Sequence, residues 1–169
     1  METKAEEKAV TIRDSAKAVI IEDGKILLQC CMNKEYGLEY FELPGGGQNP
    51  QEKMEDAVVR ECLEETGYHI EVLRFFALCE EIITVEDFHR AYPDYVHRVF
   101  HIFLCKIKDT PCQEHSEEDA NQVDVRWFPL EAVSALRLRP TNLRSALLPL
   151  FKSGEAGYLG TSILEHFEK

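Results

Sequence analysis

Residues 43–68 read LPGGGQNPQEKMEDAVVRECLEETGY, and this stretch decides the fold of the chain. Three consecutive glycines, Gly45 to Gly47, follow Pro44 and precede a long run without Gly or Pro. Glycine tolerates backbone conformations and close approaches that other residues do not. The triplet predicts either a plain strand-to-helix turn or a loop that shapes a site, and both interpretations stay open at this stage.

The run after the glycines carries the start and stop signals of a helix. Asn49 suits the N-cap, Pro50 the first helical position and Glu52 the third position of a capping box. Gly67 supplies a C-terminal stop. The pattern therefore predicts a helix over residues 50–66, packed broadly onto a sheet. Its apolar side chains form one row of Met54, Val58 and Cys62.

Three glutamates of this helix fall at positions i, i+3 and i+4, namely Glu61, Glu64 and Glu65. Such positions share one helix face, where like charges repel. One interpretation is a solvated acidic face in which Arg60 and Glu64 form an ordinary i,i+4 ion pair. The other is a site for a divalent cation, because carboxylate oxygens at this spacing suit Mg²⁺ or Mn²⁺.

The whole string resembles the Nudix box, which is written as G, five residues, E, seven residues, R-E-U-x-E-E-x-G-U, with U a bulky apolar residue. Seven residues match the fixed positions at the required spacing: Gly46, Glu52, Arg60, Glu61, Glu64, Glu65 and Gly67. The two U positions hold Cys62 and Tyr68, which are mild departures that leave the acidic set intact. The resemblance extends over most of residues 15–150.

The resemblance implies an α/β fold of the Nudix type, an α/β/α sandwich with a mixed β-sheet. It also implies a Mg²⁺-dependent or Mn²⁺-dependent hydrolase that cleaves the diphosphate bond of a small nucleotide derivative. By the same resemblance Glu61 and Glu65 are metal ligands, and Glu64 is a ligand or the general base. Arg60 would orient the glutamates, while Glu52 either caps the helix or supports the site. Gly46 and Gly67 would support the site through the backbone.

Candidate residues outside the box are less specific. Many family members take a further ligand or base from a loop, and Glu118 is the candidate here, although an acidic loop is usually only solvated. Arg90 and Tyr92 could stack a base, or could belong to an ordinary exposed connection. His97 and His101 alternate onto one face of a strand, where they could contact substrate or form structural hydrogen bonds.

The chain of 169 residues predicts one domain over residues 1–169, with a core at about 15–150 and a helical extension at about 151–169. Hydrophobic periodicity and turn residues predict the other elements. Strands are expected at 16–22, 25–31, 36–43, 68–85, 95–107 and 123–128, a polar connection at 86–94, helices at 129–136, 140–151 and 161–169, and a loop at 154–160.

Composition narrows the partners. A net charge of -12 disfavours nucleic acid polymers and anionic membranes, so a small anionic nucleotide would meet the protein through cations. The six cysteines show no ligand spacing and predict buried thiols in a reducing compartment. With no apolar leader segment, we expect a cytoplasmic protein. Monomer and homodimer both stay open.

Two rival functions follow from the same residues. The main one is a catalytically silent Nudix-like module that senses a nucleotide without hydrolysing it, although such a module would be expected to have lost the acids Glu61, Glu64 and Glu65. The other is a hydrolase of RNA ends, which the absence of a basic stripe disfavours.

Overall fold

A computed structural model describes residues 10–34, 37–108 and 122–166 of the chain. The strands are β1 (Ile12–Glu22), β2 (Lys25–Asn33), β3 (Leu38–Glu42), β4 (Ile70–Ile83), β5 (His97–Ile107), β6 (Gln122–Pro129), β7 (Leu138–Arg139) and β8 (Gly157–Leu164). The α-helices are α1 (Met54–Thr66), α2 (Glu86–Ala91) and α3 (Leu143–Ser153), and the 3-10 helices are η1 (Pro93–Tyr95) and η2 (Leu130–Ala135). Most predicted elements are therefore present, with shifted ends.

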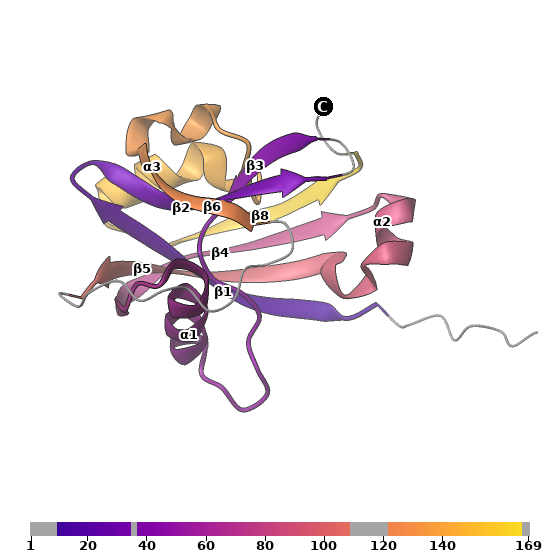
Figure 1. The fold of residues 1–169 in the computed structure, drawn as a ribbon, viewed down its shortest axis with the longest axis horizontal. Helices are drawn as coiled ribbons and strands as arrows, with labels where there is room; N and C mark the ends of the chain where they lie inside the picture. Colours follow the sequence, from indigo (N-terminus) through magenta and orange to yellow (C-terminus); the bar gives the residue numbers. More distant parts are fainter. Residues whose placement is uncertain (1–9, 35–36, 109–121, 167–169) are drawn as a thin grey trace, which may run out of the picture.

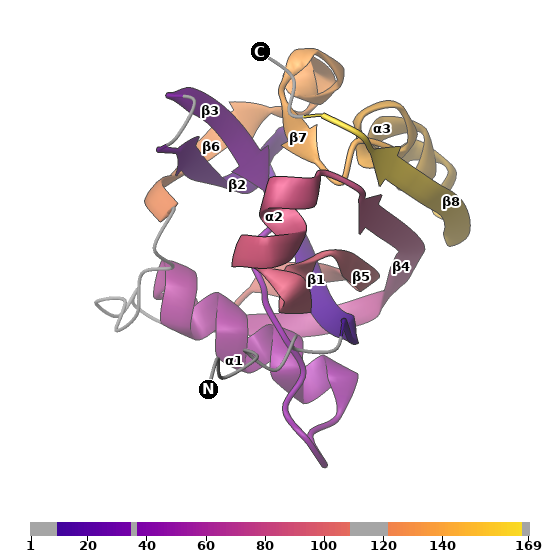
Figure 2. The same ribbon diagram turned by 90° about the vertical axis from the view of Figure 1, so that its right-hand side faces the viewer.

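The strands form one curled mixed sheet in the order β7-β3-β2-β1-β5-β4-β8, and β6 pairs with β2 off this path. The pairs β1 with β5, β3 with β7 and β4 with β8 are parallel, and the remaining pairs are antiparallel. Strands β1 and β2 pair only beside the Asp23-Gly24 turn, so the two halves of the sheet splay apart beyond it. Figure 2 shows this curl from the side.

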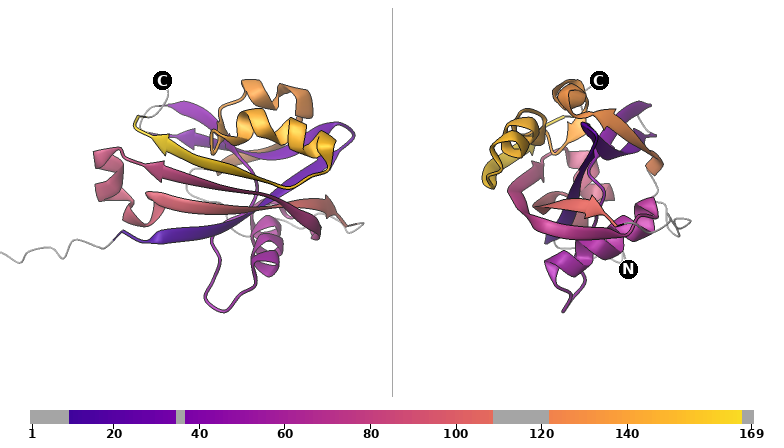
Figure 3. Two further views of the ribbon diagram at one scale, coloured as in Figure 1. Left: turned by 180° about the vertical axis from the view of Figure 1, so that it is seen from behind. Right: turned by 90° about the vertical axis from the view of Figure 1, so that its left-hand side faces the viewer.

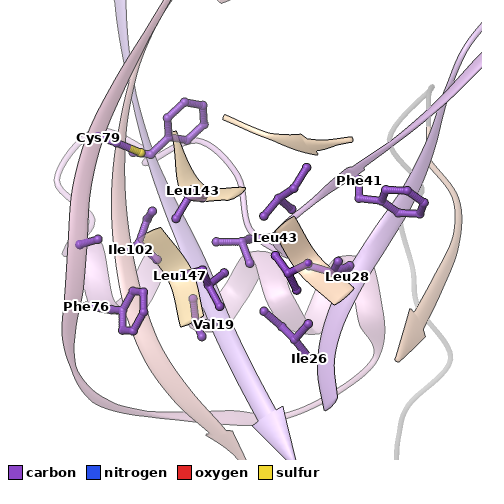
Figure 4. Packing of buried hydrophobic residues seen from close by; sticks show 14 of the residues in the cluster. Val19, Ile26, Leu28, Phe41, Leu43, Phe76, Cys79, Ile102, Leu143 and Leu147 are labelled. Atoms are coloured by element: carbon purple, nitrogen blue, oxygen red, sulfur yellow. The ribbon is translucent and has the colours of Figure 1, made fainter. Parts of the chain in front are cut away.

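Helices cover opposite faces of the sheet, with α1 on one side and α3 on the other (Figure 1). Helix α1 buries Val58 and Cys62 against small residues of β1 such as Ala16 and Ala18. A larger cluster fills the space between the two halves of the sheet and α3, where Val19, Ile26, Leu28, Phe76, Ile102, Leu143 and Leu147 meet (Figure 4). This arrangement confirms the predicted α/β/α sandwich with a mixed sheet.

Helix α1 begins at Met54 rather than at Pro50, so the predicted N-terminal end was wrong. Gln51 has a φ of 67°, which is incompatible with a continuous helix through this position. The Glu52 carboxylate still accepts a hydrogen bond from the Asn49 N–H at 2.9 Å, as a capping box requires, but within a turn that precedes the helix. The predicted stop is confirmed, because Gly67 is the C-cap with a φ of 74°.

The predicted helix at 161–169 and the loop at 154–160 were also wrong. Helix α3 ends at Ser153, and residues 157–164 form strand β8, which pairs in parallel with β4 along the sheet edge (Figure 3). This pairing brings together residues about 80 positions apart, such as Leu78 and Tyr158. Local sequence carries little information about such a partner, so the helix prediction lacked the interaction that decides the segment.

The connection between β4 and β5 contains more structure than predicted. Helix α2 occupies residues 86–91 and η1 follows at residues 93–95, so Tyr95 ends a 3-10 turn instead of opening strand β5. In the described ranges, no helix has the length and apolar character needed to cross a membrane.

Cysteines provide a first test of the packing. Five of them, Cys30, Cys31, Cys62, Cys79 and Cys105, are free and buried, as predicted, and Cys112 lies outside the described residues. Burial raises the pKa of Cys62, Cys79 and Cys105 to about 12. We predict that iodoacetamide at about pH 8 leaves these three thiols unmodified in the native protein and modifies them after unfolding, as read by peptide mass spectrometry. Rapid native-state labelling of Cys62 would contradict the packing of α1.

Candidate active site

A cavity of about 320 Å³ is lined by residues of α1, of the glycine loop (Gly45, Gly46 and Gly47) and of strands β1 and β5. Its lining combines acidic side chains, cationic side chains and two aromatic rings on a backbone of three glycines. The lining residues are Arg13, Ser15, Lys17, Glu42, Gly45, Gly46, Gly47, Glu61, Glu64, Glu65, Tyr95, Arg98 and Phe100. All three predicted metal ligands therefore face one cavity.

The glycine loop lies directly against the acids of α1. A Cβ atom on Gly46 would stand 2.3 Å from Oε2 of Glu61, so the absence of a side chain at Gly46 gives this carboxylate its place. The N–H of Gly45 donates a hydrogen bond to Oε2 of Glu65 at 2.7 Å. Of the two roles left open for the glycines, the geometry favours the shaping of a site.

Arg60 is the centre of an ion-pair network beside the cavity. Its Nε donates to Oε1 of Glu52 at 2.7 Å, and its Nη1 donates to Oε1 of Glu61 at 2.8 Å and to Oε2 of Glu64 at 3.1 Å. A further bond from Nη2 reaches the carbonyl oxygen of Gly47 at 3.0 Å. The bond from Arg60 lowers the pKa of Glu52 to about 2. The arginine thus contacts three box glutamates, Glu52, Glu61 and Glu64.

Glu65 is the most enclosed of the three box glutamates on α1, with 9% of its surface exposed. Burial raises the pKa of Glu65 to about 7, although the Lys17 charge and the Gly45 N–H both favour the ionised form. Burial of an ionised carboxylate costs free energy, so a buried Glu65 does not fit a solvated acidic face. The structure therefore argues against the solvated interpretation for this residue.

Cations from strands β1 and β5 also line the cavity. The ammonium group of Lys17 is buried, donates to the carbonyl oxygen of Gly45 and lies 3.6 Å from Oε2 of Glu42. Arg98 pairs with the buried Glu81 and lies 3.8 Å from Oε1 of Glu42. Burial alone would raise the pKa of Glu42, but the Lys17 and Arg98 charges outweigh it and lower that pKa. The cavity consequently has an acidic wall and a positively charged wall.

The donor set suits a hard divalent cation, because carboxylate oxygens of Glu61, Glu64 and Glu65 line one polar cavity and Gly46 leaves space for the first of them. The set is not assembled as a closed cage: in the part of the chain that the structure describes, no group of three or more acidic, His or Cys side chains stands ready to hold a metal ion. Arg60 engages Glu61 and Glu64 instead.

The four residues proposed for substrate contact do not line this cavity. His97 bonds Glu80 at 2.7 Å and His101 bonds Asp14 at 3.0 Å, both on the sheet face opposite to Arg98 and Phe100. Both histidines thus form hydrogen bonds to carboxylates, which is what the structural alternative expects.

Arg90 and Tyr92 are also placed elsewhere. Arg90 pairs with Glu86 and Asp87 on α2, and Tyr92 is exposed beside Phe88. Glu118 lies outside the described residues, so its role stays a prediction.

Sequence reasoning missed the positively charged wall. Lys17 stands inside the apolar run AKAVII, where a lysine is unexpected, and this was an available signal. The alternation along β5 has two faces, and the prediction followed the histidine face although Arg98 and Phe100 occupy the other. Arg13 and Tyr95 gave no comparable signal, because only the fold brings them together.

A family model described as the NUDIX domain matches residues 11–149, which is most of the chain. The chain therefore belongs to the Nudix family, a family of hydrolases that act as pyrophosphatases on nucleoside diphosphate derivatives. A search of curated proteins finds no match to the chain.

Solved structures share the fold. A UDP-X diphosphatase superposes with a TM-score of 0.62 at 20% identity, over 92% of this chain and 69% of that one. An ADP-ribose pyrophosphatase from Streptococcus suis gives 0.59 at 23% identity, over 88% and 99% of the two chains. A MutT NUDIX hydrolase from Burkholderia pseudomallei gives 0.54 at 28% identity, over 72% and 85%.

The contact between Gly46 and Glu61 leads to a prediction. Gly46→Ala places a methyl group where the Glu61 carboxylate lies, so the carboxylate must move, and kcat/KM should fall by roughly 10-fold to 100-fold. Steady-state kinetics measures the effect. The matched control is Gly157→Ala on β8, whose new methyl group would meet the flexible side chains of Leu150 at 3.2 Å and Leu159 at 3.8 Å. Equal activity of the two variants would contradict the proposed placement of Glu61.

The burial of Glu65 leads to another prediction. Its pKa in the folded protein, about 7, lies above the ordinary value of 4.5, so its stabilising contribution is present at low pH and is lost as pH rises through 7. In the presence of chelator, Glu65→Gln should match the wild type near pH 4.5 and exceed it by up to about 3 kcal/mol at pH 8. Denaturant unfolding at several pH values measures this difference. A variant that is less stable than the wild type at pH 8 would disprove the assignment.

Proposed function

We propose that this Nudix hydrolase uses Mg²⁺ or Mn²⁺ to cleave the diphosphate bond of a small nucleotide derivative, either a nucleoside diphosphate linked to another moiety or a nucleoside triphosphate. The observation that carries the proposal is the polarity of the cavity, which Glu61, Glu64 and Glu65 line together with the buried Lys17 and the half-buried Arg98. A phosphoanhydride needs both kinds of group, because its oxygens are anionic and its leaving group gains charge.

The positively charged wall suits the phosphate oxygens. Lys17 and Arg98 are oriented by Glu42 and Glu81, so their positions are set before the substrate arrives. Such preorganised charge in a partly enclosed site stabilises an anion better than mobile surface lysines do. These two cations stand in a chain of net charge -12 and are themselves paired with Glu42 and Glu81, so bound metal would still have to offset the charge that repels an anionic substrate.

The glutamates of the acidic wall have two roles. We assign Glu61 and Glu65 to metal binding and Glu64 to metal binding or to proton acceptance from the attacking water. Glu64 has the more exposed side chain, 31% against 17% for Glu61, which suits a group that exchanges protons with solvent. A bound divalent cation would supply charge neutralisation and a water of lowered pKa. Glu118 remains a proposed additional base.

The partners follow from the same charges. We propose a small nucleotide as the substrate, with neither a nucleic acid polymer nor a membrane as a partner, in a cytoplasmic protein that is a monomer or a homodimer. The silent nucleotide-sensing module remains the alternative, and the presence of Glu61, Glu64 and Glu65 in the cavity disfavours it.

A substrate panel tests the proposal. Nucleoside triphosphates, including oxidised guanine forms, would be incubated with the protein beside ADP-ribose, nucleotide sugars and dinucleoside polyphosphates, each with Mg²⁺, Mn²⁺ or chelator. We predict hydrolysis that requires metal and that falls by roughly 100-fold or more in Glu64→Gln, because the variant loses a metal ligand or the base. Phosphate and nucleotide products would be followed by chromatography.

Two results would count against hydrolysis. Turnover that persists in chelator would remove the metal from the mechanism. Tight nucleotide binding by calorimetry, without turnover of any compound, would favour the sensing module. A matched control is Glu55→Gln, which removes an exposed acid of the same helix that does not line the cavity and should leave activity unchanged.

A further inference from the structure

Three cations line the cavity, and two of them are already paired. Lys17 and Arg98 share Glu42, and Arg98 also has Glu81. Arg13 differs from both: across residues 10–34, 37–108 and 122–166, its guanidinium has no carboxylate within ion-pair distance and contacts the ring of Tyr95 at 4.7 Å. Its positive charge is therefore available to an anion that enters the cavity.

Contacts with the glycine loop and with an aromatic ring, rather than an ion pair among the described residues, hold Arg13 in place. Its side chain crosses from β1 to the glycine loop, where a Cβ atom on Gly47 would stand 2.6 Å from its Nη2. The face of the Tyr95 ring supports the other side through a cation–π contact. A guanidinium held between a ring and a glycine keeps its N–H donors for another acceptor, and phosphate oxygens match their fork geometry.

Arg13 also marks a boundary. A second, more open cavity of about 580 Å³ adjoins the first, and Arg13, Gly47 and Tyr95 line both. The rest of the second lining is mostly polar, with Thr11, Asp14, Gln48, Asn49, Gln51 and Asp94 beside the apolar Ile12 and Pro50. Among the described residues of that lining, Arg13 is the single Lys or Arg, whereas two are aspartates.

The composition of the second cavity selects what it could hold. A further phosphate would lie beside the carboxylates of Asp14 and Asp94, and among the described lining residues Arg13 is the one Lys or Arg that could face it. Hydroxyl groups, in contrast, find hydrogen-bond partners in amides, a threonine and carboxylates. Its polarity thus suits a neutral, hydroxyl-bearing group, such as a sugar, better than the end of a triphosphate.

We propose that Arg13 binds a phosphate of the substrate at the boundary between the two cavities, and that the group beyond this phosphate is neutral, bears hydroxyls and lies in the second cavity. The inference rests on the proposed function and narrows its substrate class to nucleoside diphosphates joined to a sugar-like moiety. Arg13 stands outside the Nudix box, and Tyr95 and Gly47 act as its positioning residues.

The test compares matched nucleotides. Hydrolysis of ADP-ribose against ATP, and of UDP-glucose against UTP, would be measured with Mg²⁺ for the wild type, Arg13→Gln, Arg13→Lys and Gly47→Ala. We expect the wild type to favour the sugar-linked member of a pair by at least about tenfold in kcat/KM. Arg13→Gln should raise KM by about tenfold with a smaller change in kcat, and Arg13→Lys should recover part of the loss.

Gly47→Ala keeps the charge of Arg13 but displaces it, so it should also raise KM. The matched control is Arg126→Gln, which removes an arginine from β6 that pairs with Glu39 and Asp124 far from both linings, and it should leave KM unchanged. Thermal unfolding would confirm that each variant is folded, and Arg13→Lys serves if Arg13→Gln is not.

A binding measurement separates the two levels of the proposal. Calorimetry with imidodiphosphate and Mg²⁺ should show a Kd at least about fivefold weaker in Arg13→Gln than in the wild type. If no nucleotide is hydrolysed but this difference appears, the hydrolase proposal fails and the role of Arg13 stands. If hydrolysis proceeds and Arg13→Gln has unchanged KM and unchanged Kd, the role of Arg13 is overturned. A wild type that prefers ATP and UTP overturns the sugar-like assignment.

Discussion

The arrangement of the site depends on the hydrogen bonds and ion pairs that the guanidinium of Arg60 makes. Glu52, which precedes α1, and Glu61 and Glu64, in its C-terminal half, would repel one another, yet each bonds this one cation. The same side chain bonds the carbonyl oxygen of Gly47, so it ties the loop to the helix. One residue therefore balances the charge of the acidic face and fixes the distance between two elements that the cavity needs.

The glycine loop determines how closely the neighbouring side chains can approach. Because Gly46 and Gly47 lack side chains, the Glu61 carboxylate and the Arg13 guanidinium can both lie against the loop backbone. A carboxylate from α1 and a guanidinium cation from β1 are thus brought to the same short segment. The loop separates the acidic wall from the boundary of the second cavity, and a substrate that spans both would pass over it.

The sheet supplies the cationic side chains of the cavity, because side chains alternate between its two faces along each strand. Side chains along β1 and β5 point alternately to the two faces of the sheet. Helix α1 covers the face that carries Ala16 and Ala18 of β1 and Phe103 of β5. Lys17 and Arg98 stand on the other face, where Glu42 from β3 is close enough to pair with both. Parallel pairing of β1 with β5 sets this register, and a shift of one residue would exchange the histidines for the arginine and phenylalanine.

Sequence by itself determined the Nudix class, the acids of α1, the glycine loop and most strands, because these depend on residues close together in the chain and on a fixed spacing. Tertiary structure decided where α1 begins, the formation of strand β8, the face of β5 that lines the cavity and the residues that contact Arg13. The physical reason is the range of the interactions. Helix caps and i,i+4 contacts are local, whereas strand partners and cavity walls join segments whose separation in the chain says nothing about their distance in space.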